Sequence, residues 1–279
     1  MTPQHDPAPP LLEVRDLCKR FSHGTVVAAE DVSFAIEPGG SLGIVGESGS
    51  GKTTVSRIVA GLERADSGEV LVEGHPVQPG RGHRARMERA RVMQMVFQDP
   101  YQSLDPRQSA REALAEIVAL HTGRRGAARA ARVEQLLDQV GLDSATAARM
   151  PRDLSGGQRQ RVAIARALAA EPRLLILDEA VAALDVSIQA QILRLLDRIR
   201  QETGVALMFV SHDLEVVRWI TDDVLVMFRG RTVEAGRTAE VLAAPEHPYT
   251  RLLLASVPSL DWSPRDVADA RREFIARSA

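Results

Sequence analysis

Residues 46–54 read GESGSGKTT and fit the pattern G-x-x-x-x-G-K-[ST], which is typical of a loop that binds phosphate. Residues 42–45, just before it, are apolar and predict a short buried strand. Residues 53–62, which overlap its end, have helical composition and stop near Gly61. The motif therefore lies between a strand and a helix, as its geometry requires. The alternative, a chance glycine-rich turn, is disfavoured by this context.

Each residue type in the loop has a physical role. Glycine lets the backbone turn tightly and bring its N–H groups close to an anion, and the following helix points its positive end at the same place. The Lys52 ammonium would reach the β- and γ-phosphates, and the Thr53 hydroxyl would hold Mg²⁺. The predicted nucleotide-binding residues of this loop are Gly46, Glu47, Ser48, Gly49, Ser50, Gly51, Lys52, Thr53 and Thr54.

The scarcity of lysine supports this interpretation. Of the 35 basic residues in the chain, only Lys19 and Lys52 are lysines, and all the others are arginines. A compact ammonium fits inside such a loop, whereas a planar guanidinium does not. We therefore take the lysine at position 52 as a requirement of the loop.

The bulk composition is that of an ordinary soluble globular protein. The 279 residues suffice for one large or two small domains with a substantial core, and the net charge of -2 gives no general argument for a nucleic acid partner. The single cysteine, Cys18, excludes an internal disulfide and suits a reducing compartment. The sequence predicts no membrane span and no signal peptide, so a role at a membrane would need partner subunits.

Hydrophobic patterning predicts an α/β framework with a helical insertion. Residues 1–10 are proline-rich and predict disorder, and residues 259–279 are polar. Residues 101–153 are rich in Ala, Arg, Glu and Leu and predict helices, for example over 110–120 and 128–140. The predicted strands are 11–17, 32–36, 42–45, 69–73, 92–97, 174–177, 205–210 and a hairpin of 224–228 with 231–234.

Three further features are weak on local sequence alone. Phe21 could stack on an adenine ring, but its residue type favours a half-buried strand aromatic. Gln98 follows a predicted strand and could bind Mg²⁺ or orient water, although a surface loop is the plainer interpretation. The arginine-rich run 79–91 could contact lipid or nucleic acid, and a solvated helix face is the favoured interpretation.

Residues 154–158 read LSGGQ and precede a strongly helical run at 159–170. Ser155 is a natural N-cap for that helix. A serine hydroxyl, two glycine N–H groups and a helix N-terminus together make a second anion site. An ordinary helix cap explains the local sequence equally well.

Three ionisable residues follow predicted buried strands. Residues 174–177 are all apolar, which predicts a strand buried on both faces, and they run directly into Asp178 and Glu179. In a strand these two carboxylates would point in opposite directions, so that Asp178 could bind Mg²⁺ and Glu179 could serve as a general base. His212 lies just after the strand 205–210, at the edge where ligands bind in open α/β sheets. The alternatives are a surface strand end and a structural histidine.

Together the motifs resemble those of the ATP-binding subunits of ABC transporters, from about residue 11 to residue 258. The phosphate loop, LSGGQ, LLILDE at 174–179 and His212 occur in the order and at the spacing of that family. The resemblance implies an α/β fold: a P-loop NTPase core, with a mixed sheet and flanking helices, an inserted α-helical subdomain and an N-terminal antiparallel β region. The expected divisions are a core at 11–98 and 159–245, a helical subdomain with the signature motif at 99–158, and a peptide-importer-type extension at 246–279.

The resemblance also assigns roles, with ATP and Mg²⁺ as cofactors. It implies that Phe21 stacks on adenine, that Gln98 senses the γ-phosphate and Mg²⁺, that Glu179 is the catalytic base and that His212 is the switch histidine. These assignments replace the plainer interpretations of Phe21 and Gln98. The implied catalytic residues are Glu179, His212 and Gln98, and the implied metal ligands are Thr53, Gln98 and Asp178.

The resemblance places the LSGGQ motif in a dimer interface. In this family the motif closes over the ATP held by a second subunit, in a head-to-tail dimer that separates after hydrolysis. The residues that would contact the nucleotide there are Ser155, Gly156, Gly157, Gln158 and Asp185. Residues 178–185 read DEAVAALD where the family often has DEPTSALD, so Ala182 removes one hydroxyl near the interface. We expect activity to survive, with weaker communication between the two sites.

Two stretches resemble a subfamily, the ATPases of dipeptide, oligopeptide and nickel importers. They are MVFQDPYQSLDPR at 95–107, in the form of the second of two different ATPases, and HPYTRLLLASVP at 247–258. The implied partners are a second, paralogous ABC ATPase subunit, two integral-membrane permeases and, indirectly, an extracytoplasmic solute-binding protein, with no nucleic acid. The implied location is peripheral, on the cytoplasmic face of the cell (inner) membrane, with residues 99–107 facing the permease. Because the C-terminal cysteine cluster of some members is missing, we expect no iron–sulfur cluster.

The solute would be a peptide or a related small molecule or ion, such as an opine or nickel. Two alternatives to an importer remain. One is an ATPase accessory of a soluble multi-subunit enzyme such as carbon–phosphorus lyase, whose ATPases share the HPYT-type tail. The other is a non-transport ABC protein of DNA repair or translation. That class usually has long coiled-coil insertions or two tandem ATPase units, and this chain has neither.

Overall fold

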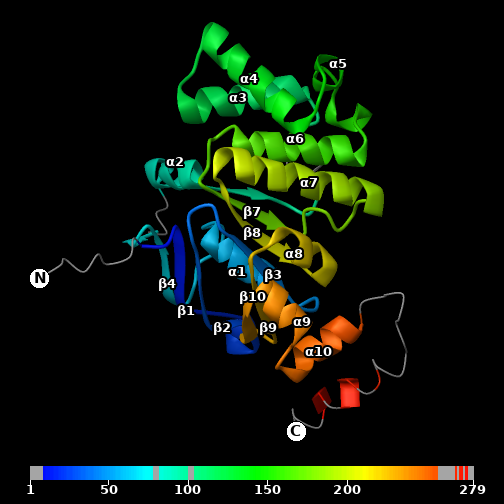
Figure 1. Cartoon of the computed structure of the whole chain (residues 1–279). Helices are drawn as coiled ribbons and strands as arrows, with labels where there is room; N and C mark the ends of the chain where they lie inside the picture. The colour runs from blue at the N-terminus through cyan, green and yellow to red at the C-terminus, as the bar shows by residue number, and fades with distance from the viewer. Residues whose placement is uncertain are drawn as a thin grey trace, which may run out of the picture.

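The computed structural model describes residues 9–77, 82–99, 104–256, 268, 270–272 and 274–275 (Figure 1). Most of the predicted N-terminal disorder (residues 1–8), residues 100–103 of the predicted permease-facing surface and much of the C-terminal tail lie outside these ranges. None of the described helices combines the length and the apolar composition that a membrane span needs.

The central element is a six-stranded mixed sheet with the order β10-β9-β3-β8-β7-β6. Five neighbouring strands run parallel and only β10 is antiparallel to β9. Strands β3, β7 and β8 are buried along their whole length, which explains their uninterrupted apolar sequences. The strands are β3 (Ser41–Val45), β6 (Met93–Val96), β7 (Leu174–Asp178), β8 (Ala206–Ser211), β9 (Asp223–Phe228) and β10 (Arg231–Arg237).

A second, antiparallel sheet has the order β2-β1-β4-β5 and is built mainly from the N-terminal part of the chain. Its strands are β1 (Leu12–Phe21), β2 (Val26–Ile36), β4 (Ser67–Val72) and β5 (His75–Pro76), with the short 3-10 helix η1 (Ser22–Gly24) between the first two. The prediction of a strand confined to residues 32–36 was wrong in extent. Strand β2 starts at Val26 because it pairs with β1 along its whole length, from Phe21↔Val26 to Leu12↔Ile36.

Helix α1 (Lys52–Val59) follows β3 and packs between the two sheets. Its buried Val55 and Val59 join Leu12 and Leu17 of β1, Ile44 of β3 and others in one apolar core. This packing fixes the start of α1, and with it the loop that precedes it. The position of the predicted phosphate loop is therefore determined by both sheets.

The remaining helices cover the other face and one end of the central sheet (Figure 1). Helices α6 and α7 lie against the sheet, and α3 and α4 lie beyond them on the side away from the strands. Leu114 of α3, Leu136 of α4 and Ile164 of α6 share one core with the buried strands. The helices predicted over 110–120 and 128–140 are thus present, as α3 and α4. The helices are α2 (His83–Val92), α3 (Ala110–Thr122), α4 (Gly126–Val140), α5 (Ser144–Ala147), α6 (Gly156–Leu168), α7 (Val186–Thr203), α8 (Leu214–Ile220), α9 (Thr238–Ala243) and α10 (Pro248–Ala255), with the 3-10 turn η3 (Pro151–Asp153).

Candidate functional site

The predicted phosphate loop connects β3 to α1. Gly46 has φ +151° and Gly51 has φ +105°. A Cβ atom at position 46 would lie 2.2 Å from the Met227 carbonyl oxygen, and one at position 51 would lie 1.9 Å from the Ala28 carbonyl oxygen. The loop therefore lies in close contact with the backbone carbonyl groups of Met227 and Ala28. Only glycine can occupy these two positions.

Lys52 is the first residue of α1 and is only 3% exposed. Its ammonium donates hydrogen bonds to the carbonyl oxygens of Gly46 (2.7 Å) and Glu47 (2.9 Å). Burial lowers the pKa of Lys52, and the neighbouring carboxylates of Glu179 and Asp178 act in the opposite direction. The loop thus encloses one compact cation, as the scarcity of lysine elsewhere predicted.

Thr53 and Asp178 bring two oxygen atoms together beside the loop. The Thr53 hydroxyl donates to Oδ1 of Asp178 at 3.2 Å, and Asp178 is only 5% exposed. Burial raises the pKa of this carboxyl group, so its ionised form is costly unless a cation compensates it. Hydroxyl and carboxylate oxygens suit Mg²⁺, which takes its other ligands from water and phosphate. This pair fits a Mg²⁺–nucleotide, and no group of three or more His, Cys, Asp or Glu that could hold a metal by itself occurs among the described residues.

Glu179 departs from the predicted geometry. Strand β7 ends at Asp178, and Glu179 has φ +49°, so the two carboxylates do not simply alternate along a strand. The Glu179 N–H still donates to the Val210 carbonyl of β8 at 2.9 Å, which holds the turn in place. Its Oε1 lies 3.7 Å from Nδ1 of His212, the residue directly after β8. Two of the three predicted catalytic side chains, Glu179 and His212, therefore lie side by side.

Glu179, His212 and the first residues of the phosphate loop border one open cleft of about 800 Å³, whose lining does not include Lys52, Thr53 or Asp178. It is lined by Gly46, Glu47 and Ser48 of the phosphate loop, by Glu179 and His212, by Asp213 and Glu215 around the start of α8, and by Leu253 and Ser256 at the C-terminal end of α10. The residues that follow the carboxyl ends of β3, β7 and β8 thus line a single cavity, as expected for a parallel sheet. Such a cleft can accommodate a phosphate chain and a water molecule beside a carboxylate.

Gln98 and Phe21 lie outside that lining. Val96 of β6 pairs with Leu177 of β7, so Gln98 and Glu179 occupy equivalent positions beyond the ends of neighbouring parallel strands. Gln98 is exposed there. Phe21 is the last residue of β1 and is 38% exposed, with the Lys19 ammonium 4.9 Å from its ring centroid. Its ring is accessible enough to stack on a planar ligand.

The LSGGQ segment caps α6. The Ser155 hydroxyl accepts from the Gln158 N–H (3.2 Å) and the Gln158 side chain accepts from the Ser155 N–H (2.9 Å), which is a capping box. Ser155 and Gly156 are exposed, and Leu154 before them is buried. A Cβ at Gly157 would lie 2.7 Å from Cγ2 of Ile188 in α7. The cap is confirmed. Asp185 is likewise exposed, at the start of α7.

Sequence reasoning missed a residue whose side chain is hydrogen-bonded to the phosphate loop. The Tyr249 hydroxyl accepts a hydrogen bond of 2.9 Å from the Glu47 N–H, across 202 residues of sequence. In the sequence, the HPYT segment carries only the resemblance to peptide-importer ATPases. Its buried aromatic residue was the available signal, but nothing in the local sequence says which loop it reaches.

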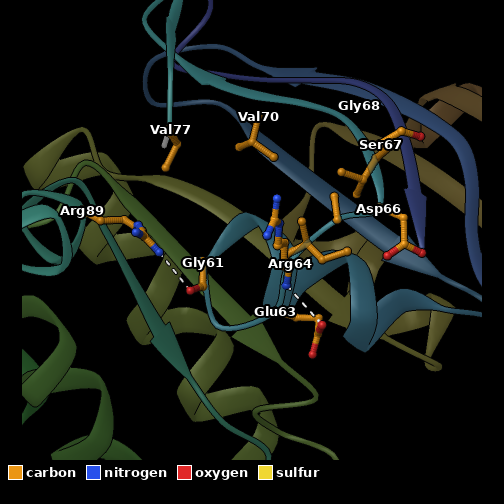
Figure 2. Close-up of a pocket in the computed structure, with 12 residues that line it drawn as sticks. Gly61, Glu63, Arg64, Asp66, Ser67, Gly68, Val70, Val77 and Arg89 are labelled. Carbon is orange, nitrogen blue, oxygen red and sulfur yellow. Dashed lines mark hydrogen bonds between the residues drawn. The ribbon is translucent and has the colours of Figure 1, made fainter. Parts of the chain in front are cut away.

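A separate pocket of about 250 Å³ lies between the C-terminal end of α1 and the antiparallel sheet (Figure 2). Leu17, Ile58 and Val70 give it apolar walls, and Arg89 spans its rim by donating to the Gly61 carbonyl at 2.9 Å. None of the predicted site residues lines it.

The loop, its enclosed lysine and the Thr53–Asp178 pair, at the carboxyl edge of a parallel sheet, define a P-loop nucleotide triphosphatase. The protein-family model "ABC transporter" matches residues 29–182, and the model "Oligopeptide/dipeptide transporter, C-terminal region" matches residues 233–274. The chain therefore belongs to the ABC transporter family, as an ATP-binding member with ATP hydrolase activity. The resemblance and the fold class stated from the sequence are both confirmed.

Named relatives agree with this assignment. The chain is 44% identical over 254 residues to the oligopeptide transport ATP-binding protein OppF of Bacillus subtilis, covering 90% of this chain and 83% of the relative. It is 44% identical over 263 residues to the glutathione import ATP-binding protein GsiA of Salmonella typhimurium, covering 91% of this chain but only 42% of the relative. The chain thus spans less than half the length of GsiA.

Solved structures show the same fold. The chain superposes on cbiO1 of Clostridium perfringens, part of the ABC transporter complex cbiONQ, with a TM-score of 0.77 and 30% identity over 86% of this chain and 93% of that one. It superposes on the ATP-binding cassette MJ0796, in a dimer bound to ADP and Pi, with a TM-score of 0.73 and 28% identity over 81% of this chain and 98% of that one.

Proposed function

We propose that this chain is the ATP-hydrolysing subunit of an ABC importer for peptides or a related small solute, such as nickel or an opine. The observation that carries the proposal is the joint presence of a loop that encloses Lys52 beside the Thr53–Asp178 pair and of a C-terminal region of the oligopeptide/dipeptide transporter type. OppF and GsiA, named as transport and import ATP-binding proteins, support import. The soluble-accessory and non-transport alternatives are not favoured.

In the proposed site the ligand is Mg²⁺–ATP. Lys52 and the loop N–H groups bind the β- and γ-phosphates, and Phe21 stacks on adenine. Thr53, Asp178 and Gln98 would hold Mg²⁺, and the bound ion would neutralise charge on the phosphate oxygens. Glu179 takes a proton from the attacking water, and His212, 3.7 Å away, stabilises that arrangement. Gln98 would complete the site from the end of β6.

The proposed active form is a head-to-tail dimer with a second ABC ATPase, by inference a paralogue. The exposed Ser155 and Gly156, with Gly157, Gln158 and Asp185, would contact the ATP held by the partner subunit. Because Ser155 already caps α6, its hydroxyl is held at a helix N-terminus, where an anion is stabilised. Ala182 supplies no hydroxyl in this interface.

The proposed assembly is peripheral, on the cytoplasmic face of the cell (inner) membrane. It contains two integral-membrane permeases and receives solute from an extracytoplasmic binding protein. The surface around residues 99–107 would face the permease, and Asp105 and Arg107 there form an exposed ion pair at 2.9 Å. The division into a core at 11–98 and 159–245, a helical subdomain at 99–158 and an extension at 246–279 also stays a prediction.

A pull-down from detergent-solubilised membranes tests the proposal, with the Glu179→Gln chain as bait in the presence of ATP. We expect two polytopic membrane proteins and a related ATPase among the captured partners. The Lys52→Ala chain is the matched control, because it lacks the cation of the phosphate site and should not capture the second ATPase in response to ATP. A purely soluble set of partners would overturn the importer assignment and leave the ATPase assignment intact.

A further inference from the structure

The C-terminal region forms part of the nucleotide cleft. Tyr249, on the first turn of α10, is fully buried, and its hydroxyl accepts from the Glu47 N–H of the phosphate loop. Leu253 and Ser256, further along and just after the same helix, line the cleft together with Glu179 and His212. A segment about 200 residues away in sequence therefore touches both the loop and the space that the phosphates would enter.

Tyr249 contacts the peptide group that joins Gly46 to Glu47. The N–H of Glu47 and the C=O of Gly46 belong to the same planar unit. Tyr249 accepts from its N–H at 2.9 Å, and the Lys52 ammonium donates to its C=O at 2.7 Å. The two side chains therefore hold opposite ends of one peptide plane, and hydrogen bonds arranged in this way polarise and strengthen one another. A rotation of that plane would move the acceptor that positions Lys52.

The tyrosine ring is itself held rigidly. It packs against Phe228 of β9, with ring centroids 4.4 Å apart, and against Phe274, with centroids 5.6 Å apart. The start of α10 is fastened to β10, because the Glu234 carboxylate accepts from the N–H groups of Glu246 (2.7 Å) and His247 (3.1 Å). Burial raises the pKa of Tyr249 to about 12, so the hydroxyl stays neutral at physiological pH. This packing holds the Tyr249 hydroxyl oxygen in a more precise position than an exposed tyrosine side chain would have.

We propose that Tyr249 is a positioning residue for the nucleotide: by holding the Gly46–Glu47 peptide it orients the Lys52 ammonium toward the phosphates. This inference rests on the proposed role of Lys52 in ATP binding. It makes the affinity of the phosphate loop depend on the docking of α10. The C-terminal region thus acts on the nucleotide site of its own subunit, in addition to whatever it contacts in a transporter.

The test compares Tyr249→Phe with Thr250→Val in the full-length chain. Tyr249→Phe keeps the packed ring and removes only the acceptor oxygen. Thr250→Val removes a hydroxyl from the next residue of the same helix, where it is equally buried and has no hydrogen-bond partner among the described residues. We expect Tyr249→Phe to raise the KM for ATP by about tenfold with kcat within about twofold of the parent, because ground-state and transition-state binding are weakened together. Thr250→Val should leave both constants unchanged.

Equal KM values for the parent and Tyr249→Phe would overturn the inference. Equal increases of KM in Tyr249→Phe and Thr250→Val would assign the effect to the packing of α10. That result would overturn the inference as well. If the parent chain itself does not bind ATP, the proposed function fails instead. Should Tyr249→Phe not fold, hydrogen exchange of the Glu47 amide in the parent decides: protection as strong as that of the α1 amides is expected, and exchange as fast as that of an exposed loop would contradict the proposal.

Discussion

The Thr53 hydroxyl donates to the Asp178 carboxylate at 3.2 Å, across 125 residues of sequence. Thr53 lies at the start of α1, directly after the phosphate loop, and Asp178 ends β7. Strand β8 lies between β3 and β7 in the sheet, so the bond crosses a strand to which neither residue belongs. It joins the part of the site expected to bind phosphate to the part expected to bind the metal.

Asp178→Asn should change the pH dependence of stability. Burial raises the pKa of Asp178 in the folded state, so the folded chain holds this proton more tightly than the unfolded chain, and stability is lost as pH rises from the unfolded value toward the folded one. Asparagine removes that loss. We therefore expect the nucleotide-free variant to gain in Tm relative to the parent as pH rises from about 4 toward neutral.

The same variant should lose the additional rise in Tm that Mg²⁺ gives in the presence of ATP. Thermal scans at several pH values, with and without Mg²⁺, measure both effects. A Tm difference between variant and parent that stays constant with pH would show that burial does not raise the pKa of Asp178. If Mg²⁺ still gives the additional rise in Tm in the variant, Asp178 is not a ligand of the metal.

Glu179→Gln should abolish ATP turnover and preserve ATP binding, because Glu179 directly follows the buried Asp178, lines the cleft and has its carboxylate 3.7 Å from the His212 ring. The expected loss in kcat is at least about 100-fold, as for removal of a general base. Phosphate release and isothermal calorimetry are the measurements. Any partner ATPase in the preparation must carry the same substitution, so that its own site does not supply the turnover.

Glu215→Gln is the matched control for that variant. Glu215 lines the same cleft from the first turn of α8, but it is paired with Arg218 at 3.6 Å and lies at the surface. Its turnover should equal that of the parent. If Glu179→Gln hydrolyses ATP at the rate of the parent, Glu179 is not the general base.

Phe21→Ala should weaken ATP binding by about tenfold, which is typical of the loss of one aromatic stacking partner for a base. Phe21→Tyr keeps the ring face and should bind like the parent. Inorganic tripolyphosphate has no base, so its affinity should be the same in all three proteins. If Phe21→Ala weakens tripolyphosphate equally, the aromatic residue acts on the fold of β1 and not on adenine.

Ser155→Asp should separate the capping role of this residue from its proposed contact with ATP. Aspartate is as good an N-cap as serine, so the stability of α6 should be maintained, whereas its charge would repel the phosphates of the partner's nucleotide. In the Glu179→Gln background we expect ATP-induced dimers to disappear, as measured by size-exclusion chromatography with light scattering.

Ser109→Ala is the matched control, since Ser109 closes an equivalent capping box with Glu112 on α3. It should cost about 1 kcal/mol of stability and leave dimerisation intact. Persistent dimers in Ser155→Asp would limit the LSGGQ serine to a structural cap.

The sequence by itself determined the features that depend on neighbouring residues. Glycines at 46 and 51 and lysine at 52 indicated the phosphate loop, because glycine alone adopts the backbone angles and close approaches at the first two positions and a compact ammonium fits inside the loop at the third. Uninterrupted apolar runs identified the buried strands β7 and β8, and Ser155 with Gln158 identified the start of α6. These patterns act over a few residues, so they can be read without knowledge of the fold.

Only the tertiary structure decided which of these pieces meet. The contacts Thr53–Asp178, Glu179–His212 and Tyr249–Glu47 depend on the order of the strands and on the packing of α1 and α10. Glu179 lies just beyond the end of β7 with a φ of +49°, and its N–H donates a hydrogen bond to the Val210 carbonyl of a different strand, β8. Such contacts are set by the burial of apolar surface across the whole domain, which no local stretch of sequence encodes.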